Sequence, residues 1–184
     1  MNNKIKLSDY VASFLSKHTD YAFVGQGSSV IHILDSIDKR KDIFNVSAQN
    51  EQGASLAADA YSRVTGHLGV SIATSGPGIL NLLQGMGCSY FDSIPSLFIS
   101  GAVPTNQLRK NKKIRQVGFQ EMEVVDIVKS LSKYAVLLRD PYKIKYELEK
   151  LIYFAKEGRP GPVVLDLPDD LSREFIDVDK LESF

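Results

Sequence analysis

Short apolar segments alternate with longer amphipathic segments along the whole of this chain. Strand-like apolar runs occupy residues 21–25, 43–47, 69–74, 96–100, 134–138 and 161–167. Helices are predicted within residues 7–15, 30–37, 51–63, 124–128 and 142–156, and a further helix opens at residues 75–78. Because the strands are apolar on both faces, this alternation predicts an α/β fold: an open six-stranded parallel sheet with helices on both faces.

The amino-acid composition limits the kinds of molecule that the chain is expected to bind. The chain has 184 residues, enough for one domain, and its 22 basic side chains balance 22 acidic ones, which argues against a nucleic-acid partner. No apolar run reaches the ~18 residues that span a membrane, and residues 1–15 lack the apolar core of a signal peptide. With Cys88 as the single cysteine, the expected location is the reducing cytoplasm.

Four loops are the candidate ligand-binding segments. In open parallel sheets, ligands bind beyond the carboxyl ends of the strands. That rule selects residues 25–27, 49–51, 74–78 and 101–104, which are also the loops with the least ordinary composition.

Glu51 stands at the start of an alanine-rich helix that follows a strand. One interpretation is a first-turn acid that interacts favourably with the helix dipole. The other is a ligand-binding carboxylate, because Ala54, Ala57 and Ala58 would let a backbone or a flat ring approach closely. The position alone favours the first interpretation.

Residues 75–78 (Ser-Gly-Pro-Gly) join a strand to a helix. Two glycines permit tight turns and close approach of a ligand, and free amides at a helix start suit an anion or a polar ring edge. The same residues also fit an ordinary strand-to-helix turn. They match neither the P-loop nor the dinucleotide-binding pattern, and Ser75 lacks the context of a hydrolase nucleophile.

A long polar loop spans residues 104–120. It is either a solvated loop or a lid over the carboxyl edge of the sheet. Phe119 and Gln120 at its end could line a substrate pocket or simply begin a helix. His18, His32 and His67 have no acidic or cysteine partners at ligand spacing, so no metal site is expected in this chain. The loop carries five cations: Arg109, Lys110, Lys112, Lys113 and Arg115.

The order and spacing of the motifs are more specific than any one of them. The segments are residues 50–54 (Asn-Glu-Gln-Gly-Ala), 58–66, 69–78, Asn81, 92–95 (Asp-Ser-Ile-Pro), 119–121 (Phe-Gln-Glu) and 159–162 (Arg-Pro-Gly-Pro). Over about residues 5–175 the chain resembles the N-terminal pyrimidine-binding (PYR) domain of thiamine-diphosphate-dependent enzymes of the acetolactate synthase type. Relatives of that type include glyoxylate carboligase, pyruvate oxidase and benzoylformate decarboxylase.

The resemblance implies a catalytic role for Glu51. In the family, the matching glutamate hydrogen-bonds N1′ of the cofactor's aminopyrimidine and favours its imino tautomer, so that the 4′-nitrogen can take the thiazolium proton. Phe119 and Gln120 match substrate-pocket residues, and Gln120 is a second catalytic candidate. The implied cofactor-binding residues are Gly25, Gly27, Glu51, Thr74, Ser75, Gly76, Pro77 and Asn81.

The resemblance also implies a reaction, namely decarboxylation or carboligation of a small 2-oxo acid. Three departures leave the 2-oxo acid and its acceptor open, because substrate choice depends on loops. Asn50 replaces the histidine usual before the glutamate, residues 26–29 replace a Pro-Gly-Gly loop, and residues 106–115 form a basic insert.

Partners are implied by what the chain lacks. It contains no Gly-Asp-Gly motif, so Mg²⁺ and the diphosphate are expected on a pyrophosphate-binding domain of the same or another chain. A homodimer or larger homo-oligomer is expected, and FAD is left open because it depends on a domain outside this chain. We expect residues 1–175 to form the domain and residues 176–184 to begin an interdomain linker.

Four alternatives remain at this point. The chain is either a fragment of a longer enzyme or a natural split alpha subunit, as in sulfopyruvate and phosphonopyruvate decarboxylases. It could instead be a non-catalytic assembly domain of the same fold. A flavodoxin-like nucleotide-binding domain fits the sheet but not the helix at Glu51. Under the leading hypothesis the isolated chain is inactive and binds the cofactor weakly.

Overall fold

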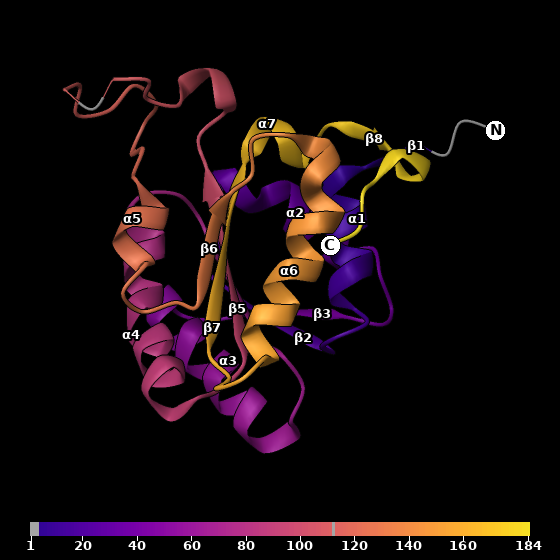
Figure 1. Ribbon diagram of the computed structural model, residues 1–184, viewed down its shortest axis with the longest axis vertical. Coiled ribbons are helices and arrows are strands. Elements are labelled where there is room, and N and C mark those ends of the chain that lie inside the picture. Colours follow the sequence, from indigo (N-terminus) through magenta and orange to yellow (C-terminus); the bar gives the residue numbers. More distant parts are fainter. Residues whose placement is uncertain (1–3, 112) are drawn as a thin grey trace.

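A computed structural model describes residues 4–111 and 113–184, so Lys112 of the basic loop lies outside the described residues. Its centre is one sheet of six parallel strands in the order β3-β2-β4-β5-β7-β6 (Figure 1). Every predicted strand is present, and all five pairings are parallel, which confirms the predicted sheet. The strands are β2 (Tyr21–Val24), β3 (Phe44–Ser47), β4 (Gly69–Ala73), β5 (Ser96–Ala102), β6 (Tyr134–Leu137) and β7 (Pro162–Pro168).

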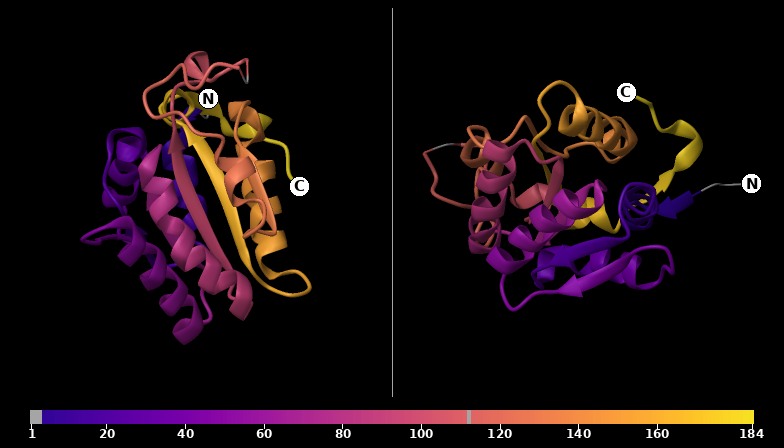
Figure 2. Two further views of the ribbon diagram at one scale, coloured as in Figure 1. Left: turned by 90° about the vertical axis from the view of Figure 1, so that its left-hand side faces the viewer. Right: turned by 90° about the horizontal axis from the view of Figure 1, so that it is seen from below.

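Helices cover both faces of the sheet, as expected (Figure 2). On one face lie α1 (Leu7–Leu15), α2 (Ile31–Asp38) and α6 (Ile144–Lys156), and on the other lie α4 (Pro77–Asp92) and α5 (Val124–Val128). Strand β7 shows why both faces must be apolar: Val163 and Leu165 join the core under α6, whereas Val164 joins the core under α4. Each face therefore has its own hydrophobic core.

Helix α3 (Glu51–Thr65) packs closely along α4. A Cβ on Gly85 would stand 2.4 Å from the backbone carbon of Ser55, so glycine is needed where the helices cross. Farther along, Asp59 is buried and accepts hydrogen bonds from Ser89 at 2.8 Å and Arg63 at 2.6 Å. This packing fixes the relative position of the first turns of the two helices.

The chain after Pro168 is more regular than its sequence indicates. Helix α7 (Asp169–Ser172) and strand β8 (Phe175–Asp177) follow β7, whereas the sequence predicted no helix or strand after residue 167. Strand β8 pairs antiparallel with β1 (Lys4–Lys6), which was not predicted either. Two strands of three residues carry too little periodicity to be recognised, and their pairing joins opposite ends of the chain.

Short 3-10 helices in the described residues are Ser28–Val30, Thr105–Gln107, Pro141–Lys143 and, after β8, Val178–Lys180. None of the helices in the described part of the chain has the length and apolar character needed to cross a bilayer.

Candidate functional site

Glu51 is the first residue of α3 and is separated from the carboxyl end of β3 by residues 48–50. Asn50 caps the helix, because its side-chain oxygen accepts a hydrogen bond from the Gly53 amide at 2.8 Å. The cap fixes where the helix begins. The Glu51 carboxylate is therefore held at a defined point of the carboxyl edge of the sheet.

The two oxygens of the Glu51 carboxylate have different surroundings. Its Oε2 accepts a hydrogen bond from Asn81 Nδ2 at 2.9 Å, from the first turns of α4. Its Oε1 faces two glycines: Cβ atoms on Gly25 and Gly78 would stand 3.1 and 3.8 Å from it. A Cβ on Gly25 would also lie 2.3 Å from Glu51 Cγ, so this acid can stand here only beside glycine.

A hollow of about 380 Å³ opens next to Glu51. It lies between the loop after β2 and the loop after β3, at the edge where parallel sheets bind ligands. Its lining residues are Gly25, Gln26, Ala48, Gln49, Asn50 and Glu51.

Ser29 organises the loop after β4. Its hydroxyl lies 2.8 Å from Thr74 Oγ1 and accepts a hydrogen bond from the Ser75 amide at 2.9 Å. Gly27 makes room for this arrangement, because a Cβ there would stand 2.3 Å from Thr74 Cβ. Sequence reasoning selected Gly27, Thr74 and Ser75 but missed Ser29, whose partners are more than forty positions away.

Gly76 turns the chain from β4 into α4 with a left-handed φ of 66°, and Pro77 begins the helix. A Cβ on Gly76 would stand 2.6 Å from Gln120 Cβ, so the end of the long loop lies directly against this turn. Gln120 itself has a φ of 57°, which is uncommon outside glycine.

Phe119 is 79% exposed and lines a second hollow, of about 330 Å³, together with Ser75. None of its lining residues belongs to the hollow beside Glu51. The candidate residues thus form two neighbouring groups: one around Glu51 and Asn81, the other where Ser75 and Gly76 meet Phe119 and Gln120. Sequence reasoning did not select His32, Asp169 and Arg173 as members of the second group.

The long loop is tied down at Arg109. Its guanidinium donates to the Ile114 and Arg115 carbonyls at 2.9 and 3.1 Å and pairs with Glu123 at 2.8 Å. Glu121 accepts from the Val117 amide at 2.8 Å and also from the Arg109 amide. The Arg109 side chain therefore makes contacts within the loop and is not a fully solvated cation.

Together, the parallel sheet, the capped glutamate and the glycine-lined loops define an α/β domain whose candidate ligand site lies at the carboxyl edge of its strands. Residues 5–129 match the family described as thiamine pyrophosphate enzyme, N-terminal TPP binding domain. The chain belongs to this family, as its resemblance implied.

Its relatives include acetolactate synthases from several organisms. The chain is 36% identical to an acetolactate synthase of Arthrospira platensis over 167 residues, which are 89% of this chain and 28% of that protein. It is 35% identical to the chloroplastic acetolactate synthase 2 of Nicotiana tabacum over 174 residues, 93% of this chain and 25% of that protein. The acetolactate synthase large subunit of Porphyra purpurea is 38% identical over 151 residues, 80% and 25% of the two chains. The chain thus spans about a quarter of the length of these relatives.

The residues present fit the pyrimidine half of thiamine diphosphate. Gly25 and Gly78 keep the space in front of Glu51 Oε1 clear of side chains. In the described part of the chain, Asn81 is the only side chain that donates to the Glu51 carboxylate, and it uses Oε2. A ring nitrogen can therefore approach Oε1 without displacing an existing hydrogen bond.

Proposed function

We propose that this chain is the cofactor-binding half of an acetolactate synthase-like enzyme that decarboxylates or carboligates a 2-oxo acid. The observation that carries the proposal is the placement of Glu51 Oε1 against Gly25 and Gly78 while Asn81 holds Oε2. Family membership supplies the class of cofactor. The acetolactate synthase relatives support the class of reaction.

Thiamine diphosphate, when bound, would supply a thiazolium carbon that is nucleophilic toward the carbonyl of a 2-oxo acid. In our proposal the Glu51 carboxyl group hydrogen-bonds N1′ of the aminopyrimidine and favours its imino tautomer. Asn81 orients that carboxyl group. A rigid strand-to-helix junction suits this task, because the acid must meet one ring nitrogen at hydrogen-bonding distance.

The remaining candidates have positioning roles in this proposal. Gly25, Gly27 and Gly76 leave space for close approach to the backbone. The wall beside the ring is formed by Thr74, Ser75 and Pro77. Phe119 and Gln120 line the entry for the 2-oxo acid, and the Gln120 amide can orient the substrate's polar atoms.

The rest of the site belongs to a pyrophosphate-binding domain on the same or another chain, which holds Mg²⁺ and the diphosphate. Support comes from the absence of a Gly-Asp-Gly motif in the 184 residues. We propose a homodimer or larger homo-oligomer in the cytoplasm, with no turnover by this chain alone. In this proposal residues 1–175 form the domain and residues 176–184 begin an interdomain linker. Any binding of FAD would depend on another domain.

The decisive experiment is Glu51→Gln in the complete enzyme that carries this domain. We expect carbon dioxide release from a panel of short 2-oxo acids to fall by about 10²–10⁴-fold. Deuterium exchange at the thiazolium carbon should fall in parallel, while affinity for Mg²⁺ and diphosphate stays unchanged. The matched control is Glu174→Gln, which removes an exposed acid outside both hollows.

An unchanged rate with altered assembly would instead support a non-catalytic assembly domain. Tight binding of flavin or nucleotide by the chain would support the flavodoxin-like alternative. The intact mass of the native protein separates the remaining two: a product of 20.4 kDa means a split subunit, and a much larger one means a fragment.

A further inference from the structure

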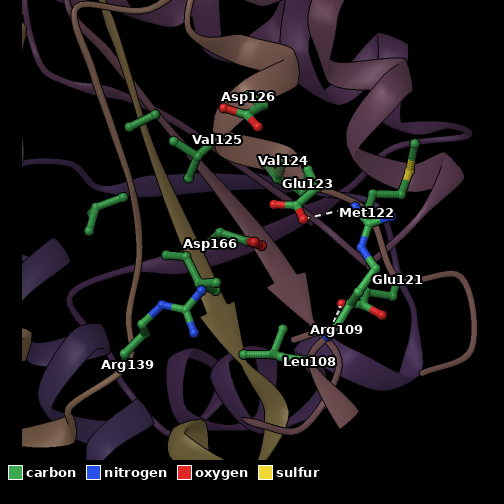
Figure 3. A pocket seen from close by; sticks show the side chains of 13 residues that line it. Leu108, Arg109, Glu121, Met122, Glu123, Val124, Val125, Asp126, Arg139 and Asp166 are labelled. Carbon is green, nitrogen blue, oxygen red and sulfur yellow. Dashed lines mark hydrogen bonds and ion pairs between the residues drawn. The ribbon is translucent and has the colours of Figure 1, made fainter. Parts of the chain in front are cut away.

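A third and larger pocket, with a volume of about 430 Å³, lies beside strands β6 and β7. Figure 3 shows its lining side chains. It is bounded by β6 and β7, by α5, and by the segment that leads into α5. It shares no lining residue with the hollow at Glu51 or with the hollow at Phe119. Its size falls in the range of small-molecule sites, about 300–1,000 Å³.

Asp166 forms the floor of this pocket. It interrupts the apolar run of β7 and is 2% exposed, and Figure 3 shows its carboxylate among the lining side chains. Among the residues that the structure describes, none offers a hydrogen bond to its Oδ1. Burial raises the pKa of Asp166 to about 7, although a hydrogen bond from Ser100 opposes the rise. A buried acceptor without a partner costs about 1–3 kcal/mol, so a donor that reaches Asp166 Oδ1 would relieve this cost.

Two of the other charged groups around Asp166 pair with each other. Arg109 is paired with Glu123 at 2.8 Å, which neutralises both charges. Glu121 accepts from two backbone amides of the loop. Asp126 also lines the pocket, and Arg139 lies on the opposite side of Asp166 with an exposed side chain (Figure 3). Of the lining residues that the structure describes, four carry carboxyl groups and two carry guanidinium groups.

The remaining wall is apolar. Leu108, Met122, Val124 and Val136 present aliphatic surface beside the acidic floor. A ligand that fits must therefore combine a hydrogen-bond donor with a short apolar body. An anion would be repelled by the four carboxylates. A neutral hydrogen-bond donor would be attracted to the buried, ionised Asp166 less strongly than a cation.

We propose that this pocket binds a small organic cation with N–H donors and a compact apolar body, with the Asp166 carboxylate as its counter-ion. The donor satisfies Oδ1, and the apolar body packs on the aliphatic wall. Because only the ionised acid attracts a cation, binding must strengthen as Asp166 loses its proton. Asp166 also lines a small cavity with Ser75 and Gly76, so the pocket adjoins the candidate cofactor site, but it shares no lining residue with the hollow at Glu51. The test of the proposal needs no cofactor.

The test is calorimetric titration of the 184-residue chain with benzamidine, a planar amidinium on an apolar ring. Neutral benzamide and anionic benzoate are the matched probes of the same shape. We expect benzamidine to bind at least about tenfold more tightly than benzamide at pH 8, and benzoate not to bind. Benzamidine affinity should rise about tenfold from pH 6 to pH 8, following the ionised fraction of a group with a pKa of about 7.

Asp166→Asn keeps the shape of the side chain and removes its charge. It should weaken benzamidine at pH 8 by at least about tenfold and abolish the dependence on pH. Val125→Trp places a large side chain from α5 in the pocket and should abolish benzamidine binding. This variant tests the site even if Asp166→Asn does not fold. Glu174→Gln, a loss of one exposed acid outside the pocket, should change nothing.

Three results overturn the proposal. The first is tighter binding of benzoate than of benzamidine, which would make the arginines the anchors. The second is benzamidine binding that survives Asp166→Asn in a folded variant. The third is the absence of saturable benzamidine binding at millimolar concentration at pH 8. None of these results bears on Glu51, whose role is measured by enzyme turnover.

Discussion

Asn81 Nδ2 donates a hydrogen bond of 2.9 Å to Glu51 Oε2, so a residue of α4 orients the acid that begins α3. The two residues are 30 positions apart, and the close crossing of their helices at Gly85 and Ser55 brings them together. The acid at the centre of the proposed site is thus positioned by helix packing as well as by its own cap.

Asn81→Ala should lower turnover of the complete enzyme by about tenfold, because the Glu51 carboxyl group loses its orienting donor. The free energy of unfolding should change by less than about 0.5 kcal/mol, since Asn81 is exposed. Steady-state rates and urea denaturation measure the two effects. Gln84→Ala, an exposed position of the same helix, is the control, and an equal loss of rate in both variants would remove the special role of Asn81.

Gly25→Ala should displace the Glu51 side chain, because the added Cβ would stand 2.3 Å from Glu51 Cγ. We expect a loss of turnover of about 10²-fold, as for a misplacement of about 1 Å at a catalytic group. Cofactor titration of the complete enzyme should show weaker binding as well. Wild-type turnover by this variant would mean that Glu51 is not held as the structure shows.

Gly85→Ala and Gly87→Ala should change stability in opposite directions, although both lie in α4. A Cβ on Gly85 would meet the Ser55 backbone at 2.4 Å, whereas a Cβ on Gly87 meets nothing within 4 Å. We expect the first to destabilise by about 1–3 kcal/mol and the second to stabilise by about 0.5–1 kcal/mol. Urea denaturation of the chain checks both, and a stable Gly85→Ala variant would contradict the close helix crossing.

Asp166→Asn should stabilise the chain increasingly as the pH rises. Burial raises the pKa of Asp166 from 3.8 to about 7, so between these values the folded state binds the proton more tightly than the unfolded chain. The stability contributed by the protonated acid is complete below pH 4 and is lost as the pH rises through 7. The difference between variant and wild type should grow from near zero to at most about 4 kcal/mol at pH 8.

Ser29→Ala should destabilise more than Thr74→Val. The first removes the acceptor of the Ser75 amide as well as the contact with Thr74, whereas the second leaves the Ser75 bond at 2.9 Å intact. We expect a cost of about 1–2 kcal/mol for Ser29→Ala and about half of that for Thr74→Val. Chemical denaturation measures the pair, and equal costs would mean that the Ser75 bond contributes nothing.

The sequence predicted the six strands of the parallel sheet and the loops of the candidate site. These predictions depend on local patterns, namely apolar runs for buried strands and glycine at turns, which need no knowledge of distant residues. Glu51, Gly25 and Thr74 were selected because they follow strands whose carboxyl ends share one edge. Their roles toward the cofactor came from the family resemblance and remain predictions.

Tertiary structure alone decided the contacts that give those residues their roles. Ser29 reaches Thr74 and Ser75, Asn81 reaches Glu51, and β1 pairs with β8, each across a long stretch of chain. Asp166 illustrates what the sequence alone cannot predict. An acid within an apolar strand is visible in the sequence, but its lack of a hydrogen-bond partner and its pocket are not. Local sequence patterns encode periodicity, whereas hydrogen-bond partners and cavities depend on how separate elements pack, and this packing exists only in the folded chain.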